Sequence, residues 1–477
     1  MNLYILLFFF LPLRLQTWRA LTGLMPVITA SVVCFSVSTQ AVQLDPIAPP
    51  LPQDAVPVTP GLTTGSTPIV VDGRVAVQLG KALFWDAGVG RSGIACASCH
   101  FQAGADHQAT AQSAHRPPAW FVALHSDGLE PCVPETKAQA QFKHPPRNAP
   151  SIINAAVNFR NFRDGRANNR FNGQTPYGAR DGQAGVFEWR QGQVVKTRIL
   201  LENAALASQA MEPPVNPMEM ACRHQTFPDI ARHLLRLRPL EHQTVHPEDS
   251  VLADIRAAQG KGLSVDYAEL IRKSFAPRFW EATEGDFGRP LSGGQPYKQM
   301  EANFAFFFGL AIQMYESTLI SNQTRFDSPR DTQGYPSAYR PEERRGLDVF
   351  NRAECDFCHR GPVFSAATHP ALFSEPGQVE PLHLVERRVL RVDRKTRSTY
   401  TPLSDVGYAN IGVTPSSQDV GLGGTDPHGQ PLSFAAQYLT TLAYPEHRMP
   451  DPVTVIASTF SLGFRVGFAP EELRPPL

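Results

Sequence analysis

Apolar residues recur at helical spacing along much of this chain. In residues 72–88, Val75, Leu79, Leu83 and Phe84 fall on one face of a helix, and we expect that face to be buried in a core. Residues 147–156 predict a turn that leads into a helix, and further helices are expected at about residues 201–211, 228–238, 249–259 and 266–277.

The strongest helical pattern lies at residues 298–320. The run Phe304–Ile312 is wholly apolar, but Glu301, Gln313 and Glu316 flank it closely. A membrane span needs about 20 predominantly apolar residues. We therefore predict a buried core helix here rather than a membrane span.

Turn-forming residues divide the rest of the chain. Residues 186–198 are typical of a β-hairpin that turns near Gly192. Residues 327–341 contain several Pro and Gly and predict a linker, after which Pro341 starts a helix. Residues 361–435 are predicted to be rich in loops, and no terminal helix is expected. The expected fold class is therefore mainly α, with long loops and a small β-hairpin insertion.

Composition narrows the classes of function. The chain has 477 residues, enough for two or three domains with cores of their own. Its 44 lysines and arginines balance 44 aspartates and glutamates. The charge therefore does not favour binding to nucleic acid or to an acidic membrane surface.

The N-terminus is typical of an export signal. Two arginines precede the apolar run at residues 20–37, and Thr39-Gln40-Ala41 is a suitable cleavage site. Residues 1–41 are therefore predicted to be a signal peptide, and residues 42–66 an extended leader. Export predicts a periplasmic protein. An uncleaved membrane anchor is the alternative, and the protein would contact a membrane only in that case.

The chemistry of the chain centres on two Cys-x-x-Cys-His motifs. The first is Cys96-Ala97-Ser98-Cys99-His100, and the second is Cys355-Asp356-Phe357-Cys358-His359. On one helical turn the two sulfurs lie close together, and each can form a thioether to a haem vinyl group. The following His is then held beneath the iron. We therefore predict two covalently attached c-type haems, with His100 and His359 as the proximal iron ligands.

The two motifs fit a dithiol redox pair or a zinc site less well than a haem. A dithiol redox pair does not need a His after the second Cys, and half a zinc site would need a second ligand pair nearby. Two further cysteines, Cys132 and Cys222, could form a disulfide in an oxidising compartment or remain buried thiols. Any one histidine of the polar loop 101–147 could be a second axial ligand, but each by itself is more typical of an exposed side chain: His107, His115, His125 and His144.

The motifs stand among other distinctive stretches. These are LGKALFWD at 79–86, RNAPSIINAA at 147–156, FRDGRA at 162–167, QAMEPPVNPMEM at 209–220, SNQTRFD at 321–327 and CDFCHRGPVFS at 355–365. Together they resemble the bacterial di-haem cytochrome c peroxidases and their MauG-like relatives over most of residues 72–425. The resemblance implies two cytochrome c-like haem domains. A peroxidatic domain would span 67–326 and an electron-transfer domain 342–477.

The resemblance also implies roles for two residues of the first domain. The family places a Gln and a Glu, ten residues apart, at the peroxide site, and Gln209 and Glu219 match them. A carboxylate can move a proton between the two peroxide oxygens, and an amide can hold peroxide by hydrogen bonding. The alternative for Glu219 is an acid at a helix start after Pro217, stabilised by the helix dipole.

The chain departs from the family pattern at the position of a Trp that normally relays electrons between the haems. Arg163 stands there. A guanidinium cannot be oxidised as an indole can, but it can pair with haem propionates. Trp189, in the predicted hairpin, is a candidate replacement. Residues 168–200 are an insertion relative to the shortest family members and would cover the active site or form a partner surface.

The segment that normally supplies the distal ligand of the second haem is not recognisable. Met449 is the only Met after His359, and its context is unrelated. Tyr408 resembles a haem-edge stretch rather than the ligand. A C-terminus truncated or frameshifted after about residue 440 would explain the difference. The family also binds calcium between its domains, and Asn148 matches one contributor.

Together these features predict a periplasmic di-haem peroxidase. It would reduce hydrogen peroxide at the first haem with electrons that enter the second from a small cytochrome c or a cupredoxin. The alternatives are a MauG-like oxidation of a protein or organic substrate, a di-haem electron-transfer cytochrome without peroxide chemistry, and an inactive chain. A homodimer is suggested only by the family relatives.

Overall fold

A computed structural model of the chain describes residues 47–457, apart from 91–92, 101–103, 105–146, 218, 222–224, 373–383, 388–390, 393–398, 401–402, 406, 409–414, 448–449 and 452–453. The chain divides into Met1–Leu44 and Asp45–Leu477, and all the described residues belong to the latter unit. Several predictions fall outside the described residues and stay predictions: the signal peptide, the four loop histidines, Cys132, Cys222 and Met449.

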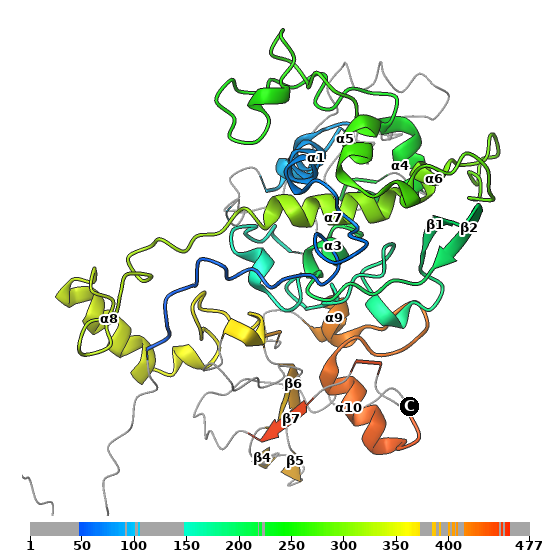
Figure 1. Ribbon diagram of the computed structural model, residues 1–477. Helices are drawn as coiled ribbons and strands as arrows, with labels where there is room; N and C mark the ends of the chain where they lie inside the picture. Colours follow the sequence, from blue (N-terminus) through cyan, green and yellow to red (C-terminus); the bar gives the residue numbers. More distant parts are fainter. Residues whose placement is uncertain are drawn as a thin grey trace, which may run out of the picture. The chain divides into compact units, whose positions relative to one another are not determined.

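The described chain is mainly helical, as predicted (Figure 1). Its α-helices are α1 (Gly73–Trp85), α3 (Ala205–Gln209), α4 (Phe227–Leu234), α5 (Tyr267–Ser274), α6 (Gln299–Ala302), α7 (Phe304–Glu316), α8 (Pro341–Arg352), α9 (Val420–Gly423) and α10 (Phe434–Ala443). The predicted start of α8 at Pro341 is confirmed. The helix that was not expected near the C-terminus is α10. Its N-terminus is capped by Ser433, whose side chain accepts a hydrogen bond from the Ala436 N–H.

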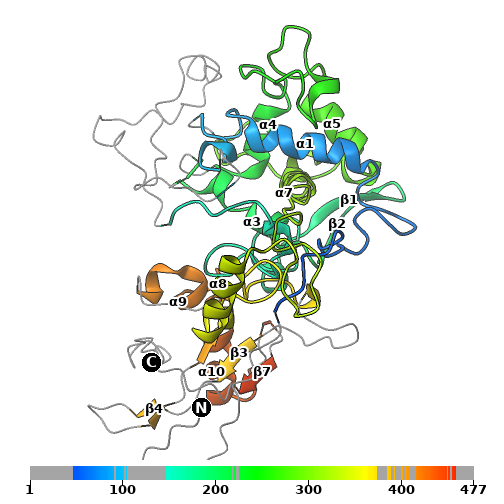
Figure 2. The same ribbon diagram turned by 90° about the vertical axis from the view of Figure 1, so that its left-hand side faces the viewer.

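Helices α1 and α7 cross at the centre of the main core. Figure 1 views α1 almost along its axis, and Figure 2 views α7 in that way. Leu79 and Leu83 of α1 are fully buried, and so are Phe304 and Phe308 of α7. A Cβ at Gly80 would overlap the carbonyl oxygen of Ala311, so only glycine lets the two helices approach this closely. The predicted core face of α1 and the buried character of α7 are both confirmed. None of the helices in the described ranges has the length and apolar character of a membrane span.

The predicted hairpin is present. Strand β1 (Val186–Arg190) pairs antiparallel with β2 (Gln193–Thr197), in a register that runs from Val186 opposite Thr197 to Arg190 opposite Gln193. Gln191 and Gly192 form the two-residue turn, both with positive φ, of 50° and 81°. This conformation matches the twist of the paired strands.

Further strands lie in the segment that was predicted to be rich in loops. Strand β3 (Leu384–Arg387) pairs antiparallel with β6 (Leu403–Asp405) and parallel with β7 (Thr454–Ala457). A second pair joins β4 (Arg391–Val392) to β5 (Thr399–Tyr400). Strands β3 and β7 lie beside α10 (Figure 2). Each strand is too short to show a period in the sequence, and the partner of β3 in the parallel pair, β7, lies about 70 residues further along the chain.

One predicted helix is wrong, and one predicted turn into a helix is followed by no more than a 3-10 turn. Residues 249–259 contain only the 3-10 turn η5 (Ala253–Ile255). The Asp249 carboxylate accepts hydrogen bonds from the N–H groups of Val251 and Leu252, and this local bonding competes with helix formation. Residues 147–156 lead only into the 3-10 turn η2 (Ala155–Val157).

Side-chain bonds to distant segments also explain why other helices are shorter than predicted. Asn154, before η2, has φ of 60° and is bonded to the backbone of Ser321 by both side-chain atoms. The segment 298–320 is divided at Asn303, whose amide binds the backbone of Phe187 and Phe279. Both asparagine side chains form hydrogen bonds to distant backbone groups, and hydrophobic periodicity in the sequence does not reveal such bonds.

A buried ionic cluster joins residues of the N-terminal half to the C-terminal segment. Asp451 forms ion pairs with Arg160 at 2.9 Å and with Arg180 at 2.6 Å. Their side chains are at most 6% exposed. The Tyr408 hydroxyl donates to the Arg160 carbonyl and accepts from its N–H, both at 2.9 Å. This region therefore holds parts of the chain that lie far apart in sequence.

Candidate functional site

The first Cys-x-x-Cys-His motif forms a 3-10 turn, η1 (Cys96–Ser98), held by its own backbone. The N–H groups of Cys99 and His100 donate to the Cys96 carbonyl at 3.1 and 3.0 Å. The Nδ1 atom of His100 lies 2.9 Å from the Pro150 carbonyl oxygen. Because a carbonyl oxygen only accepts, Nδ1 carries the proton, and Nε2 is then the ring nitrogen that would ligate a metal.

The second motif repeats this arrangement. It forms η7 (Cys355–Phe357), and the His359 N–H donates to the Cys355 carbonyl at 2.9 Å. The His359 Nδ1 atom lies 3.2 Å from the Phe364 carbonyl oxygen. Phe350 contacts the rings of both His359 and Phe364, with centroid distances of 6.4 and 5.8 Å. Each motif thus places two thiols beside a histidine of defined tautomer, which fits a covalently attached haem.

The two motifs differ in their exposure to solvent. Cys96, Cys99 and His100 are half-buried, whereas Cys355, Cys358 and His359 are exposed. Burial and the nearby carboxylates raise the pKa of the Cys96 thiol.

Glu219 lies in the turn after Asn216, close to the first motif. The Asn216 side-chain amide donates to Glu219 Oε1 at 3.0 Å. After burial and Glu316, the charge of Glu219 contributes to the raised pKa of the Cys96 thiol. Helix α4 begins only at Phe227, so Glu219 does not start a helix, and the alternative explanation of this acid fails.

Burial makes the carboxyl of Glu219 hard to ionise. Its pKa is raised to about 7, chiefly by burial and then by the negative charge of Glu212, while Arg166 and the bond from Asn216 oppose the rise. A group with a pKa close to the working pH can both accept and return a proton. The environment of Glu219 therefore suits acid–base chemistry at neutral pH.

A chain of ionic contacts links this environment to α9. Arg166 donates from Nε and a terminal nitrogen to Glu212 Oε2, at 2.9 and 2.6 Å. Its other terminal nitrogen donates to Asp164 Oδ1 at 2.9 Å. Asp164 Oδ2 in turn accepts the Gly421 N–H of α9 at 2.7 Å. Because Arg166 and Glu212 both influence Glu219, the docking of α9 bears on the charge balance at the candidate site.

Gln209 is the last residue of α3 and is half-buried. Its carbonyl oxygen accepts the Glu212 N–H at 3.3 Å. Helix α3 packs against α7 where Gly309 leaves room, since a Cβ there would lie 3.0 Å from the Ala207 carbonyl oxygen. Gln209 and Glu219 therefore share Glu212 as a neighbour. Their roles at a peroxide site remain predictions.

Arg163 and Asn148 have surroundings that leave their predicted roles untested. Arg163 lies 3.5 Å from Asp419 Oδ2, and Arg147 pairs with the same carboxylate at 2.5 Å. Asn148 is exposed, two residues before Pro150. Within the described residues, no group of three or more His, Cys, Asp and Glu side chains gathers to hold a metal ion. Binding of propionates by Arg163 and of calcium by Asn148 both remain predictions.

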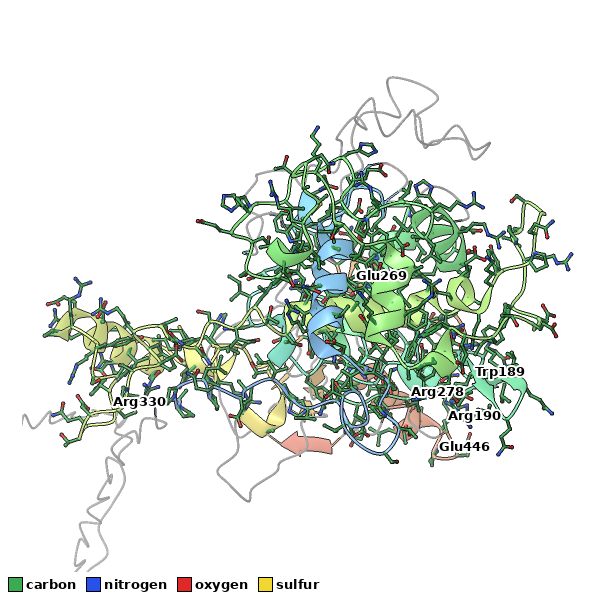
Figure 3. The ribbon with its side chains drawn as sticks, turned by 45° about the horizontal axis from the view of Figure 1, so that its top comes forward. Trp189, Arg190, Glu269, Arg278, Arg330 and Glu446 are labelled. Carbon is green, nitrogen blue, oxygen red and sulfur yellow. The ribbon has the colours of Figure 1, made fainter. Side chains whose placement is uncertain are left out.

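Trp189, the candidate replacement relay, lies on the hairpin beside Arg190 and Arg278 (Figure 3). Both arginines pair with Glu188 of the same strand, Arg278 at 3.3 Å. Trp189 itself stands opposite Val194 in the hairpin, and its role as a relay remains a prediction.

The sequence indicated no functional role for the aromatic residues beside the first motif, and of these Phe84 was predicted only as part of a core face. The Trp85 indole N–H donates to the Tyr315 hydroxyl at 3.1 Å. The Phe84 ring contacts both members of this pair and also the His100 ring. The stretch LGKALFWD contains two of these residues, but its helical spacing indicated only a core face.

Comparison with known proteins agrees with this geometry. The family model described as di-haem cytochrome c peroxidase matches residues 74–333. The match includes the first motif, Gln209 and Glu219, and ends before the second motif. No curated protein matches the chain.

Proposed function

Because the chain belongs to the di-haem cytochrome c peroxidase family, we propose that it reduces hydrogen peroxide to water in the periplasm. The electrons would come from a small c-type cytochrome or a cupredoxin. The observation that carries the proposal is the ionisable Glu219 beside the half-buried first motif. In this proposal residues 67–326 form the peroxidatic domain, residues 327–341 the linker, and residues 342–477 the electron-transfer domain.

The chain's own residues would hold peroxide and move its protons. When bound, each haem supplies the redox chemistry of iron, with His100 and His359 as ligands through Nε2. The Glu219 carboxylate takes the proton from one peroxide oxygen and returns it to the other. The Gln209 amide donates a hydrogen bond that orients the molecule. Calcium at Asn148 belongs to the same proposal.

Electrons would enter at the second motif, which is the exposed one. A protein donor needs direct access to the edge of the acceptor group, and the exposed Cys355, Cys358 and His359 meet this requirement.

Covalent attachment is tested independently of activity. Haem that is bound through thioethers stays with the polypeptide after acid–acetone extraction. We expect two haem masses on the intact chain, one after Cys96→Ser/Cys99→Ser, and one after Cys355→Ser/Cys358→Ser. Extraction of both haems from the wild-type chain would contradict the proposed cofactor chemistry.

Activity is tested on the full, haem-loaded protein. Reduced small cytochrome c and reduced cupredoxin are offered separately, and their oxidation is followed after hydrogen peroxide is added. We expect turnover that is lost in Glu219→Gln and kept in Glu446→Gln, which changes an exposed carboxyl. Peroxide-driven oxidation of an added protein, without use of either donor, would favour MauG-like chemistry. Two low-spin haems that do not respond to peroxide would favour electron transfer alone.

A further inference from the structure

Trp85 and Tyr315 form a hydrogen-bonded pair close to the first motif. Trp85 is the last residue of α1 and is partly exposed, whereas Tyr315 of α7 is only 5% exposed. The indole N–H donates to the tyrosine hydroxyl at 3.1 Å. Indole and phenol are the two side chains that give up a single electron most readily to a strongly oxidised centre.

Phe84 connects this pair to the proximal histidine. Its ring is 1% exposed and lies 5.5 Å from the Tyr315 ring and 6.1 Å from the Trp85 ring, centroid to centroid. The His100 imidazole lies 6.2 Å from the same Phe84 ring, also centroid to centroid. An unbroken series of rings therefore leads from the iron ligand of the first site to a partly exposed indole.

We propose that Trp85, supported by Tyr315, carries oxidising equivalents from the first haem site to the protein surface. This inference rests on the proposed reaction with peroxide, which supplies the oxidant. Reduction of hydrogen peroxide to water takes up two electrons and two protons. In this proposal the Trp85 indole would supply one of the electrons and the first haem the other. The indole becomes a radical cation and keeps its N–H proton, which stays bonded to the Tyr315 oxygen.

The surroundings favour Trp85 over Tyr315 as the residue that loses the electron and carries the positive charge. A phenol must lose its proton when it is oxidised, and burial raises the pKa of Tyr315. An indole can lose an electron without losing its proton. The Tyr315 oxygen, as acceptor of the indole N–H, stabilises the positive charge.

This route would leave the second haem aside. Arg163 occupies the position of the usual relay between the haems, and its guanidinium cannot be oxidised. A small one-electron donor, such as a phenol in solution, would therefore give its electron to the oxidised Trp85 indole and not to the second haem. Trp189 of the hairpin is the other candidate relay, and the test has to distinguish it from Trp85.

The test uses the full, haem-loaded protein mixed with hydrogen peroxide and no donor. Samples frozen at short times are examined by electron paramagnetic resonance, and longer incubations by peptide mass spectrometry. We expect an indole radical and oxygen added to Trp85 in the wild type and in Trp189→Phe. Both are expected to be lost in Trp85→Phe, and the radical is expected to change its spectrum in Tyr315→Phe.

The haem absorption spectrum separates the two proposals. A spectrum that responds to peroxide while neither radical nor oxidation appears at Trp85 would overturn this route and leave the peroxidase proposal standing. Oxidation of Trp189 in place of Trp85 would also overturn it. A spectrum that does not respond to peroxide would overturn both. The wild-type measurements alone can contradict the inference, so the test does not depend on whether Trp85→Phe folds.

Discussion

At the scale of single residues, the protonation of Glu219 is set by a small number of neighbours. Burial disfavours its charge, and the Glu212 carboxylate adds to this effect. Arg166 acts in the opposite sense, but it is already engaged by Glu212 through two hydrogen bonds. The pair Arg166–Glu212 therefore adjusts the acidity of Glu219 without contacting it directly.

The pH dependence of the peroxide reaction follows from this arrangement. If Glu219 must be ionised to accept a proton, the rate rises with pH through about 7, where the pKa of this carboxyl lies. Glu219→Gln removes the proton acceptor and should lower the rate by about 10²–10⁴-fold. The measurement is the rate of the absorption change after peroxide is added, from pH 5 to 9.

Substitutions of Glu212 and Arg166 should move the midpoint of the pH–rate profile in opposite directions. Glu212→Gln removes a negative charge that raises the pKa of Glu219, so the midpoint moves to lower pH. Arg166→Gln removes a positive charge that lowers this pKa, so the midpoint moves to higher pH. A midpoint that stays fixed in both variants would show that another group controls the reaction.

The ligands and their orientation differ in how far they can be predicted. The motifs are local, so Cys96, Cys99 and His100 follow from spacing alone. The carbonyl that fixes the His100 tautomer belongs to Pro150, 50 positions away. Nothing in the motif indicates this partner, because it depends on how a distant loop is placed.

At the scale of elements, the crossing of α1 and α7 positions the first site. Turn η1 is the next element after helix α1 in the chain, and α7 lies below α1 in Figure 1. The close approach depends on Gly80, which faces the backbone of Ala311. Such contact transmits changes in one helix directly to the other, because packed interiors have little free space.

Two glycine substitutions test the crossing. Gly80→Ala places a methyl group against the Ala311 carbonyl, and overpacking of this kind costs about 1–3 kcal/mol or more in the free energy of unfolding. Gly346→Ala in α8 meets no atom within 4 Å and should stabilise its helix by about 0.4–1 kcal/mol. Thermal unfolding of both variants measures the difference. Equal stabilities would mean that α1 and α7 can separate without cost.

Helix existence was predicted more reliably than helix length. Leu79 and Leu83 showed the core face of α1, and Pro341 showed the start of α8, because these features depend on local spacing and backbone geometry. The ends of other helices depend on tertiary bonds, such as those of Asn154 and Asn303. The sequence alone does not show where such side chains find partners.

At the scale of the whole described unit, the ionic cluster around Asp451 joins distant parts of the chain. Asp451 accepts from Arg160, Arg180, Asn168 and Gln437. Its partner Arg180 lies 271 positions away in sequence. Neither residue stood out in the sequence, since a charge pattern does not show which pairs become buried. The C-terminal segment, which lacks a recognisable family motif, is thus anchored to the N-terminal half by charge.

Removal of the Asp451 charge should strongly destabilise this junction. Asp451→Asn leaves Arg160 and Arg180 buried without their shared counter-ion, and breaking a buried pair in this way costs about 3–5 kcal/mol. The control is Glu446→Gln, which alters an exposed carboxyl that Figure 3 labels. Denaturant unfolding of both variants gives the comparison. If Asp451→Asn unfolds at the same denaturant concentration as Glu446→Gln, the cluster does not hold the C-terminal segment in place.

The same cluster predicts how stability responds to acid. Burial opposes ionisation of Asp451, but the charges of Arg160 and Arg180 outweigh it and hold its pKa well below the usual range. A carboxyl with a lowered folded-state pKa stabilises the protein above its unfolded pKa of about 3.9 and loses that contribution as the pH falls further. Wild-type stability should therefore fall below about pH 4 more steeply than that of Asp451→Asn. Unfolding free energies measured from pH 3 to 7 decide this, because parallel curves for the two proteins would mean that Asp451 is not ionised in the folded chain.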